Sequence, residues 1–224
     1  MTLENFHPEK PKPKIYLPEV RAIINSIKYL RDKEKELTGK GDKKDTLHHS
    51  QRVANLGYLL AKHQKFSDEE TNFFVETCLL HDIGKMQVPV KYLTRASGKF
   101  GSKDRKVLTH HPDWGYSILK DEGRSPRVYN PVYYHHEYQE QSYPDTKAKV
   151  LKRMENTEDI DFDNARLLAM ADVFDRRIFG SSNIPPQLPE QAEEKLKEQF
   201  DQPGDAEIIA FLFLQCEEIK NLNI

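Results

Sequence analysis

The chain has 224 residues, of which 37% are hydrophobic and 31% are charged. Its length favours one domain with short extensions. The 34 lysines and arginines nearly balance the 36 aspartates and glutamates, which excludes a broad basic field for polymeric nucleic acid. The longest apolar run, 208–214, is far shorter than the ~20 residues that cross a bilayer, and no signal peptide is evident. With only two cysteines, Cys78 and Cys216, we expect a cytoplasmic protein without membrane contact.

The first half of the chain predicts helices. Prolines among lysines at 1–14 predict an extended arm, and apolar residues at three- and four-residue spacing after Pro18 predict a first helix that Gly39 can end. A second helix is predicted at 45–63. Ser67, followed by a glutamate three residues later, predicts the capped start of a third helix, which leads to a His-Asp pair.

The second half also predicts helices. They are expected at 102–111, 114–120, 165–176, 189–200 and 205 to about 222. Ser102 and Asp163 are the expected N-caps, while 128–134 is ambiguous between helix and a short strand. Because no segment sustains a two-residue alternation, we predict an all-α fold.

Polar side chains interrupt several of these segments where the helices are expected to turn inward. They are His49, His81, Asp82, His111, His135, His136 and Asp172. Imidazole and carboxylate bind iron, manganese, nickel and zinc, and seven ligands exceed the needs of one tetrahedral ion. An aspartate next to a histidine suits two ions, because each carboxylate oxygen can bind one. The set therefore predicts a metal centre around the adjacent His-Asp pair.

Each residue alone also has a structural interpretation. A histidine in an apolar segment, such as His81, is more often a hydrogen-bonded core residue than a ligand. Asp172 and Asp175 could equally be helix caps or members of ion pairs. Only the ordered set favours metal binding over these alternatives.

Five stretches carry a resemblance to a known family. They read HHSQRVANLGYLLA at 48–61, LLHDIGKMQVP at 79–89, HHPDWGYSIL at 110–119, HHEYQEQSYP at 135–144 and ADVFD at 171–175. In this order they resemble the HD superfamily of metal-dependent phosphohydrolases, and more narrowly its HD-GYP branch.

The resemblance implies an HD-domain helical bundle around a multinuclear metal centre. The arm and first helix would occupy 1–44, and the HD domain, with the C-terminal helices, 45–224. Asp82 would bridge two ions, with His49, His81 and Asp172 on one ion and His111, His135 and His136 on the other. Asp45 stands where some family members have a glutamate that helps to bind a third ion, so the resemblance also allows a third ion here. The family and the histidine-rich ligation favour iron or manganese.

The implied activity is hydrolysis of a cyclic dinucleotide, above all cyclic di-GMP, by a metal-bridging hydroxide in bacterial signalling. Asp82 and Lys85 would be catalytic, the ammonium meeting a non-bridging phosphate oxygen; the alternative for Lys85 is a surface lysine. Further contacts to a small nucleotide substrate would come from Tyr143, Arg176 and Arg177, although the two arginines also suit a solvated helix end.

The chain departs from the branch in the loop after its second histidine pair. Ser142 replaces a family glycine, Tyr138 replaces an arginine, and 124–179 contains no glycine, which removes backbone conformations with positive φ. Other functions therefore stay open: another HD-type nucleotide phosphohydrolase, a di-iron oxygenase, or a non-catalytic, metal-stabilised protein that binds a nucleotide or a partner. Regulation would come through the first helix, a signalling partner or a homodimer.

Overall fold

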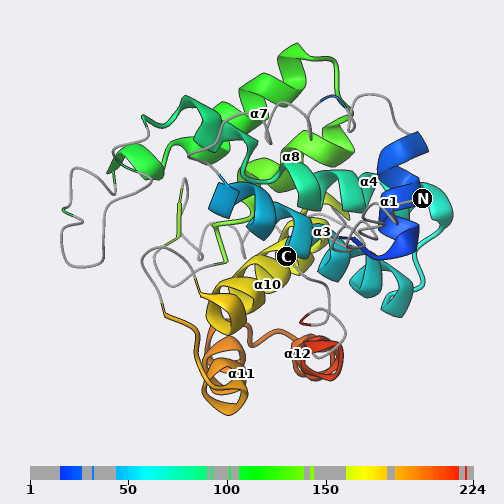
Figure 1. Ribbon diagram of the computed structural model, residues 1–224, viewed down its shortest axis with the longest axis vertical. Helices are drawn as coiled ribbons and strands as arrows, with labels where there is room; N and C mark the ends of the chain where they lie inside the picture. Colours follow the sequence, from blue (N-terminus) through cyan, green and yellow to red (C-terminus); the bar gives the residue numbers. More distant parts are fainter. Residues whose placement is uncertain are drawn as a thin grey trace, which may run out of the picture.

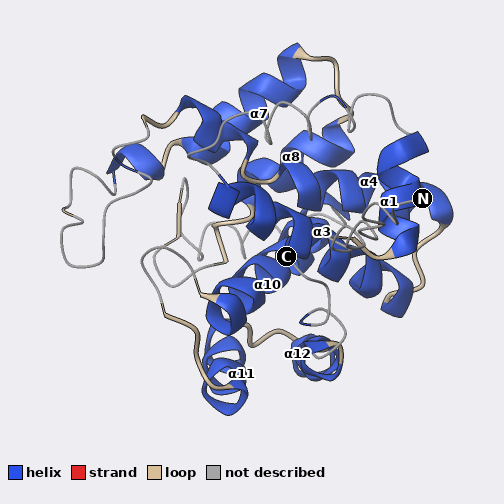
Figure 2. Cartoon of the chain, in the orientation of Figure 1, coloured by secondary structure: helices blue, strands red, loops and turns tan. Residues whose placement is uncertain are grey.

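The computed structural model describes residues 16–26, 32, 44–89, 92, 101, 106–138, 142–143, 160–180, 185–216 and 220. Its helical elements are α1 (Pro18–Ser26), α3 (Lys44–His63), α4 (Asp68–Leu80), the 3-10 helix η2 (Ile83–Gln87), α7 (His111–Asp121), α8 (Pro126–Tyr134), α10 (Ile160–Phe179), α11 (Pro189–Gln199) and α12 (Asp205–Leu214). These residues contain no strand, which confirms the predicted all-α class (Figure 2). In the same part of the chain, no helix has the length and apolar character needed to cross a membrane.

Helix α4 is largely buried within the bundle. Every residue from Phe74 to Leu80 is buried, and the helix packs against α1, α3, α8 and α10. The predicted capping box is confirmed: the Ser67 hydroxyl accepts from the Glu70 amide at 3.2 Å, and the Glu70 carboxylate accepts from the Ser67 amide at 2.8 Å. Because the start of α4 is set locally and its body is buried, its C-terminus delivers the next two residues into the interior.

Helices α3 and α10 pack against one another alongside α4 (Figure 1). On α3, Val53, Leu56 and Leu60 recur at three- and four-residue spacing and are fully buried. On α10, Leu168 and Phe174 are fully buried. In Figure 1 the C-terminal helices α11 and α12 lie below α10; both contact α10, and α12 also contacts α3.

A close backbone approach joins η2 to α7. A Cβ added at Gly84 would lie 1.9 Å from the carbonyl oxygen of His111 and 2.6 Å from the amide nitrogen of Gly115. Since both neighbours are backbone atoms, only glycine allows this approach. The contact places the first residue of α7 beside the residue that precedes η2.

The structure differs from the predicted boundary before α7, and it resolves the ambiguous stretch at 128–134. His111 begins α7 instead of ending an earlier helix, because Pro112 suits a first turn, where its missing N–H is no loss. The ambiguous stretch is helix α8, since the Ser125 hydroxyl accepts from the Arg127 amide and Pro126 occupies the first turn. Ser102, the expected cap of the helix predicted at 102–111, lies outside the described residues.

The C-terminal part shows two further differences. Helix α10 begins at Ile160, so Asp163 lies inside it and is not its cap. The extra turn is anchored by Phe162, which is buried and whose carbonyl accepts from the Tyr138 hydroxyl at 2.9 Å. Helix α12 ends at Leu214, earlier than predicted. The arm at 1–14 and Gly39 fall outside the described part of the chain.

Candidate metal centre

The fold brings the seven predicted ligands together from five elements. His49 comes from α3, His81 and Asp82 from the end of α4, His111 from the first residue of α7, His135 and His136 from the end of α8, and Asp172 from α10. All seven are buried. Asp45, the candidate for a third ion, lies in the first turn of α3, and its side chain is outside the described part.

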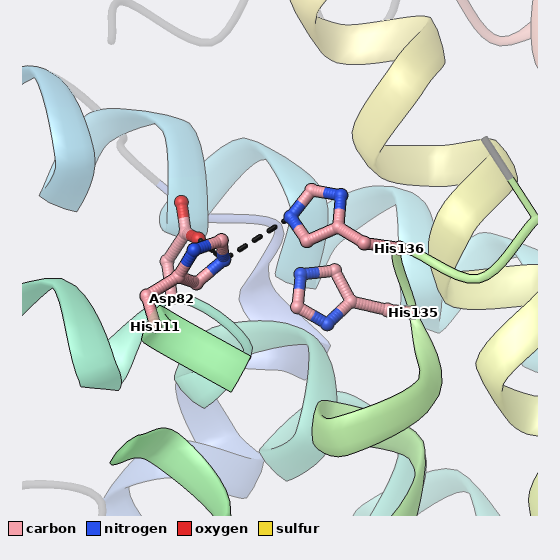
Figure 3. A group of neighbouring side chains, drawn as sticks. All are labelled: Asp82, His111, His135 and His136. Carbon is pink, nitrogen blue, oxygen red and sulfur yellow. Dashed lines mark hydrogen bonds and ion pairs between the residues drawn. The ribbon is translucent and has the colours of Figure 1, made fainter. Parts of the chain in front are cut away.

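The two oxygens of Asp82 face two different groups of imidazoles. Oδ1 lies 3.2 Å from Nε2 of His111, whereas Oδ2 lies 3.7 Å from Nε2 of His49 and 3.5 Å from Nε2 of His81. Figure 3 shows Asp82 and His111 converging with His135 and His136. In each of the two groups that share Asp82, the candidate ligand atoms lie within 4.8 Å of one another.

Asp172 lies beside the two imidazoles that face Oδ2 of Asp82. Its Oδ1 lies 2.9 Å from Nε2 of His49 and 3.8 Å from Nε2 of His81. The described part of the chain therefore offers three side chains on either side of a shared carboxylate.

Backbone carbonyls set the tautomers of three histidines. In each case Nδ1 donates to the carbonyl of the residue three positions earlier, from His81 to Cys78, from His111 to Leu108 and from His135 to Val132, at 2.8, 2.7 and 2.6 Å. A neutral imidazole with its proton on Nδ1 carries its lone pair on Nε2. These Nε2 atoms are therefore the available ligand atoms.

The Nε2 atoms approach one another in pairs. His49 and His81 bring them to 3.2 Å, and His111 and His136 to 3.1 Å. Each contact needs a proton or a cation between the nitrogens, because two lone pairs repel. Two nitrogens about 2.1 Å from one ion and at right angles would be about 3 Å apart. The residues therefore fit metal ions in both groups.

Burial keeps the imidazoles on the Oδ1 side neutral. Burial lowers the pKa of His111, and it lowers the pKa of His135 and His136 well below the ordinary value, with neighbouring imidazoles adding to the effect. For His49, burial acts in the same direction but is outweighed by hydrogen bonds to two aspartates, which raise its pKa. Because these three imidazoles are already neutral, they can bind an ion without first releasing a proton.

Both candidate carboxylate ligands are ionised. Burial would raise the pKa of Asp82, but the positive charge of Lys85 and the neighbouring imidazoles hold it well below the ordinary value. Burial is likewise outweighed at Asp172, whose pKa is lowered by Arg176 and His49. The geometry agrees: Lys85 Nζ donates to Oδ2 of Asp82 at 2.5 Å, and Arg176 Nε donates to Oδ1 of Asp172 at 2.6 Å.

Asp175, which the sequence indicated only as a helix cap or an ion-pair residue, contacts one of the candidate ligands. Its Oδ2 accepts from Nδ1 of His49 at 2.6 Å, and its carboxylate also accepts two hydrogen bonds from Arg52. This arrangement orients the His49 ring and turns its Nε2 toward the centre. A signal was present: Arg52 and Asp175 each follow a predicted ligand by three residues, which places them on the same helix faces.

The predicted substrate residues divide into two groups. Lys85 lies on η2, not on a continued α4, and contacts Asp82. The Tyr143 ring stacks on His136 at 4.5 Å between centroids, and Arg176 lies against the carboxylates. Arg177 instead donates to Oε1 of Gln187 at 3.1 Å and is not among the side chains of the centre.

The structure is an all-α bundle with a buried cluster of imidazoles and carboxylates, and this arrangement defines a class of helical metal-binding domains. A family model, described as the HD domain, matches residues 46–177. The chain therefore belongs to the HD domain family.

Curated relatives and solved structures agree with this assignment. The cyclic di-GMP phosphodiesterase response regulator RpfG of Xanthomonas campestris is 29% identical over 130 residues, which are 56% of this chain and 31% of that protein. The 3'3'-cGAMP-specific phosphodiesterase 2 of Vibrio cholerae is 26% identical over 204 residues, which are 87% of this chain and 37% of that protein. The chain thus spans about a third of the length of these relatives.

The solved structures match at the level of the fold. The HD domain of the L. monocytogenes phosphodiesterase PgpH superposes with a TM-score of 0.55 at 16% identity, covering 91% of this chain and 99% of that one. The same domain in complex with cyclic-di-AMP superposes with a TM-score of 0.57 at 19% identity, covering 85% and 98%. This likeness shows the HD-domain architecture.

Proposed function

We propose that the chain is a metal-dependent phosphodiesterase that hydrolyses a cyclic dinucleotide. The observation that carries this proposal is the position of Asp82, whose two oxygens face His111 on one side and the pair His49 and His81 on the other. A carboxylate shared in this way suits two ions. The printed activities of the two curated relatives support the same reaction class.

The proposed ligands are His49, His81 and Asp172 for one ion and His111, His135 and His136 for the other, with Asp82 shared. When bound, two ions lower the pKa of a bridging water, supply a hydroxide nucleophile and take up charge on the phosphate. Histidine-rich ligation favours iron or manganese. A third ion near Asp45 stays a proposal.

Lys85 is proposed to bind the phosphate. Its ammonium donates to Oδ2 of Asp82 at 2.5 Å, and its side chain is 15% exposed. It thus stands beside the shared carboxylate and reaches solvent, where a phosphate oxygen can approach. A donor at this place would stabilise negative charge that develops on a non-bridging oxygen.

Tyr143 is proposed to bound the other side of the substrate site. Its ring stacks on His136 and lies edge-on to His111, with centroids at 4.5 and 6.1 Å. A ring in this position limits access to the Oδ1 group and offers an aromatic face near a nucleotide base.

Cyclic di-GMP is our first choice of substrate within this class. The names of the two relatives and of the solved complex give three different cyclic dinucleotides. The bases that this chain prefers can therefore be determined by comparing these three substrates directly. We also propose a cytoplasmic location, which suits the two buried free cysteines, Cys78 and Cys216.

The test is metal content and turnover on one anaerobically purified sample supplied with iron or manganese. Cyclic di-GMP, 3'3'-cGAMP and cyclic-di-AMP are offered in parallel, together with a linear dinucleotide. We expect about two ions per chain and turnover of at least one cyclic substrate. The matched variant Asp82→Ala should lose both ions and all turnover. Metal without turnover of any cyclic dinucleotide would contradict the proposal and favour another phosphate ester, an oxidative reaction or a binding role.

A further inference from the structure

Three buried aspartates in and beside the centre are each paired with a lysine or an arginine side chain. Asp82 faces Lys85, Asp172 faces Arg176 and Asp175 faces Arg52. The aspartate side chains have no exposed surface. Without any ion, their negative charges are therefore already balanced within the protein.

The pair between Arg176 and Asp172 differs from the other two in its position. Nε of Arg176 donates to Oδ1 of Asp172 at 2.6 Å, and this same oxygen lies 2.9 Å from Nε2 of His49. The guanidinium thus contacts the carboxylate atom that faces the imidazoles. By contrast, Arg52 contacts Asp175, which lies on the far side of the His49 ring.

Arg176 also has unused hydrogen-bonding capacity. Its Nη2 makes no hydrogen bond to any described residue and lies 3.6 Å from Oδ2 of Asp82. Its side chain is 27% exposed. The guanidinium therefore lies beside both carboxylates with a buried, unsatisfied Nη2, while the side chain as a whole is partly exposed. Its planar fork matches the geometry of a phosphate.

We propose that Arg176 is a resident cation that a metal ion displaces from Oδ1 of Asp172, and that the displaced guanidinium then binds a non-bridging phosphate oxygen of the substrate. A divalent ion and a guanidinium on the same carboxylate oxygen repel each other strongly in a buried site. The first half of this proposal is independent of the proposed function, and the second half rests on it.

Metal titration tests the first half. Mn²⁺ binding is measured by calorimetry on chelator-treated wild type, Arg176→Gln, Arg176→Lys and the control Arg127→Ala. Arg127 is exposed to a similar extent and also pairs with carboxylates, here two glutamates, but it lies outside the centre. We expect Arg176→Gln to bind the ion at least tenfold more tightly, and the other two variants to stay within a few-fold of wild type. Unchanged or weaker binding by Arg176→Gln would overturn the displacement and make Arg176 an orienting residue.

A second measurement follows the Arg176 side chain directly in the wild-type protein, and a variant is needed only to assign its signal. Arginine Nε–H resonances are followed by NMR during addition of Zn²⁺, with Arg176→Lys used to assign the signal. The Arg176 Nε–H signal should shift as its bond to Asp172 is lost, whereas the Arg52 Nε–H signal, from the bond to Asp175, should persist. Persistence of both signals at full metal occupancy would contradict the proposal.

Steady-state kinetics test the second half. With both proteins fully loaded with metal, Arg176→Gln should raise the KM for the cyclic dinucleotide about 10- to 100-fold. An unchanged KM would overturn the phosphate contact. If wild-type protein turns over no cyclic dinucleotide, the proposed function fails, and the titration still decides whether Arg176 competes with the ion.

Discussion

Nδ1 of His49 donates to Oδ2 of Asp175 at 2.6 Å, although the two residues are 126 positions apart in the chain. The bond joins α3 to α10 and turns Nε2 of His49 toward the centre, where it lies 2.9 Å from Oδ1 of Asp172. Arg52 completes the arrangement by donating to both oxygens of the same carboxylate. A histidine held in this way has a defined ring orientation before any ion binds.

Replacing the carboxylate that holds His49 should weaken metal binding without unfolding the protein. In Asp175→Asn, the amide cannot satisfy both the ring and the guanidinium of Arg52, so we expect metal affinity to fall about 10- to 100-fold. Calorimetry with Mn²⁺ gives this number. Asp163→Asn is the control, because it alters an exposed carboxylate on the same helix. Equal affinity in the two variants would mean that Asp175 has only a structural role.

Removing the ammonium beside Asp82 should separate metal binding from turnover. We expect Lys85→Met to keep its ions and to lower kcat about 10²-fold or more, because this variant removes the positive charge that is proposed to contact the phosphate oxygen. Metal analysis and single-turnover kinetics are measured on one sample, with Lys62→Met as the control for an exposed lysine. Full activity in Lys85→Met would remove this residue from the mechanism.

A single methyl group at the contact between η2 and α7 should damage the centre from a distance. Gly84→Ala places a Cβ 1.9 Å from the His111 carbonyl oxygen, where no flexible side chain can move aside. We expect a loss of about 1–3 kcal/mol in unfolding free energy and weaker metal binding on the His111 side. Chemical denaturation and metal analysis test this. As a control, Gly123→Asn tolerates a side chain because no atom lies within 4 Å, and asparagine accepts its positive φ. Wild-type stability of Gly84→Ala would be inconsistent with the close approach.

The metal-free protein should lose stability on mild acidification. His111, His135 and His136 have lowered pKa values in the fold, so the unfolded chain binds more protons as the pH falls through about 6.5, and stability falls with it. His49 acts oppositely: its raised pKa gives stability that is present below 6.5 and lost as the pH rises.

Three imidazoles outweigh one, so the melting temperature in the presence of chelator should drop between about pH 7.5 and about pH 5.5. The aspartates add nothing in this range, because their lowered pKa values matter only below the ordinary 3.8. His135→Gln should flatten the dependence, and His110→Gln, which changes an exposed side chain, should leave it unchanged. A melting temperature that rises on acidification would contradict the assignment.

Local features were predictable because their causes lie within a few residues of each other. The capping box at Ser67 and Glu70 and the apolar spacing on α3 depend on bonds and faces inside one helix. The candidate ligands were also visible, because histidines and aspartates in apolar segments need partners. Where a boundary depended on packing, as at Phe162 in the first turn of α10, the local signal at Asp163 was misleading.

Only the tertiary structure decided which carboxylate oxygen faces which histidine nitrogen in the centre. The separate roles of Oδ1 and Oδ2 of Asp82 depend on the approach of α7 to η2 across Gly84, a contact between two segments with no local signature. The contrast between Arg176, which lies against the carboxylates, and Arg177, which turns to Gln187, likewise follows from how α10 packs. Sequence alone determined the chemistry available to the centre, because residue types are local. Its geometry required the folded chain, because the distances from Asp82 to His49 and His111, and from Asp172 to His49, join different helices.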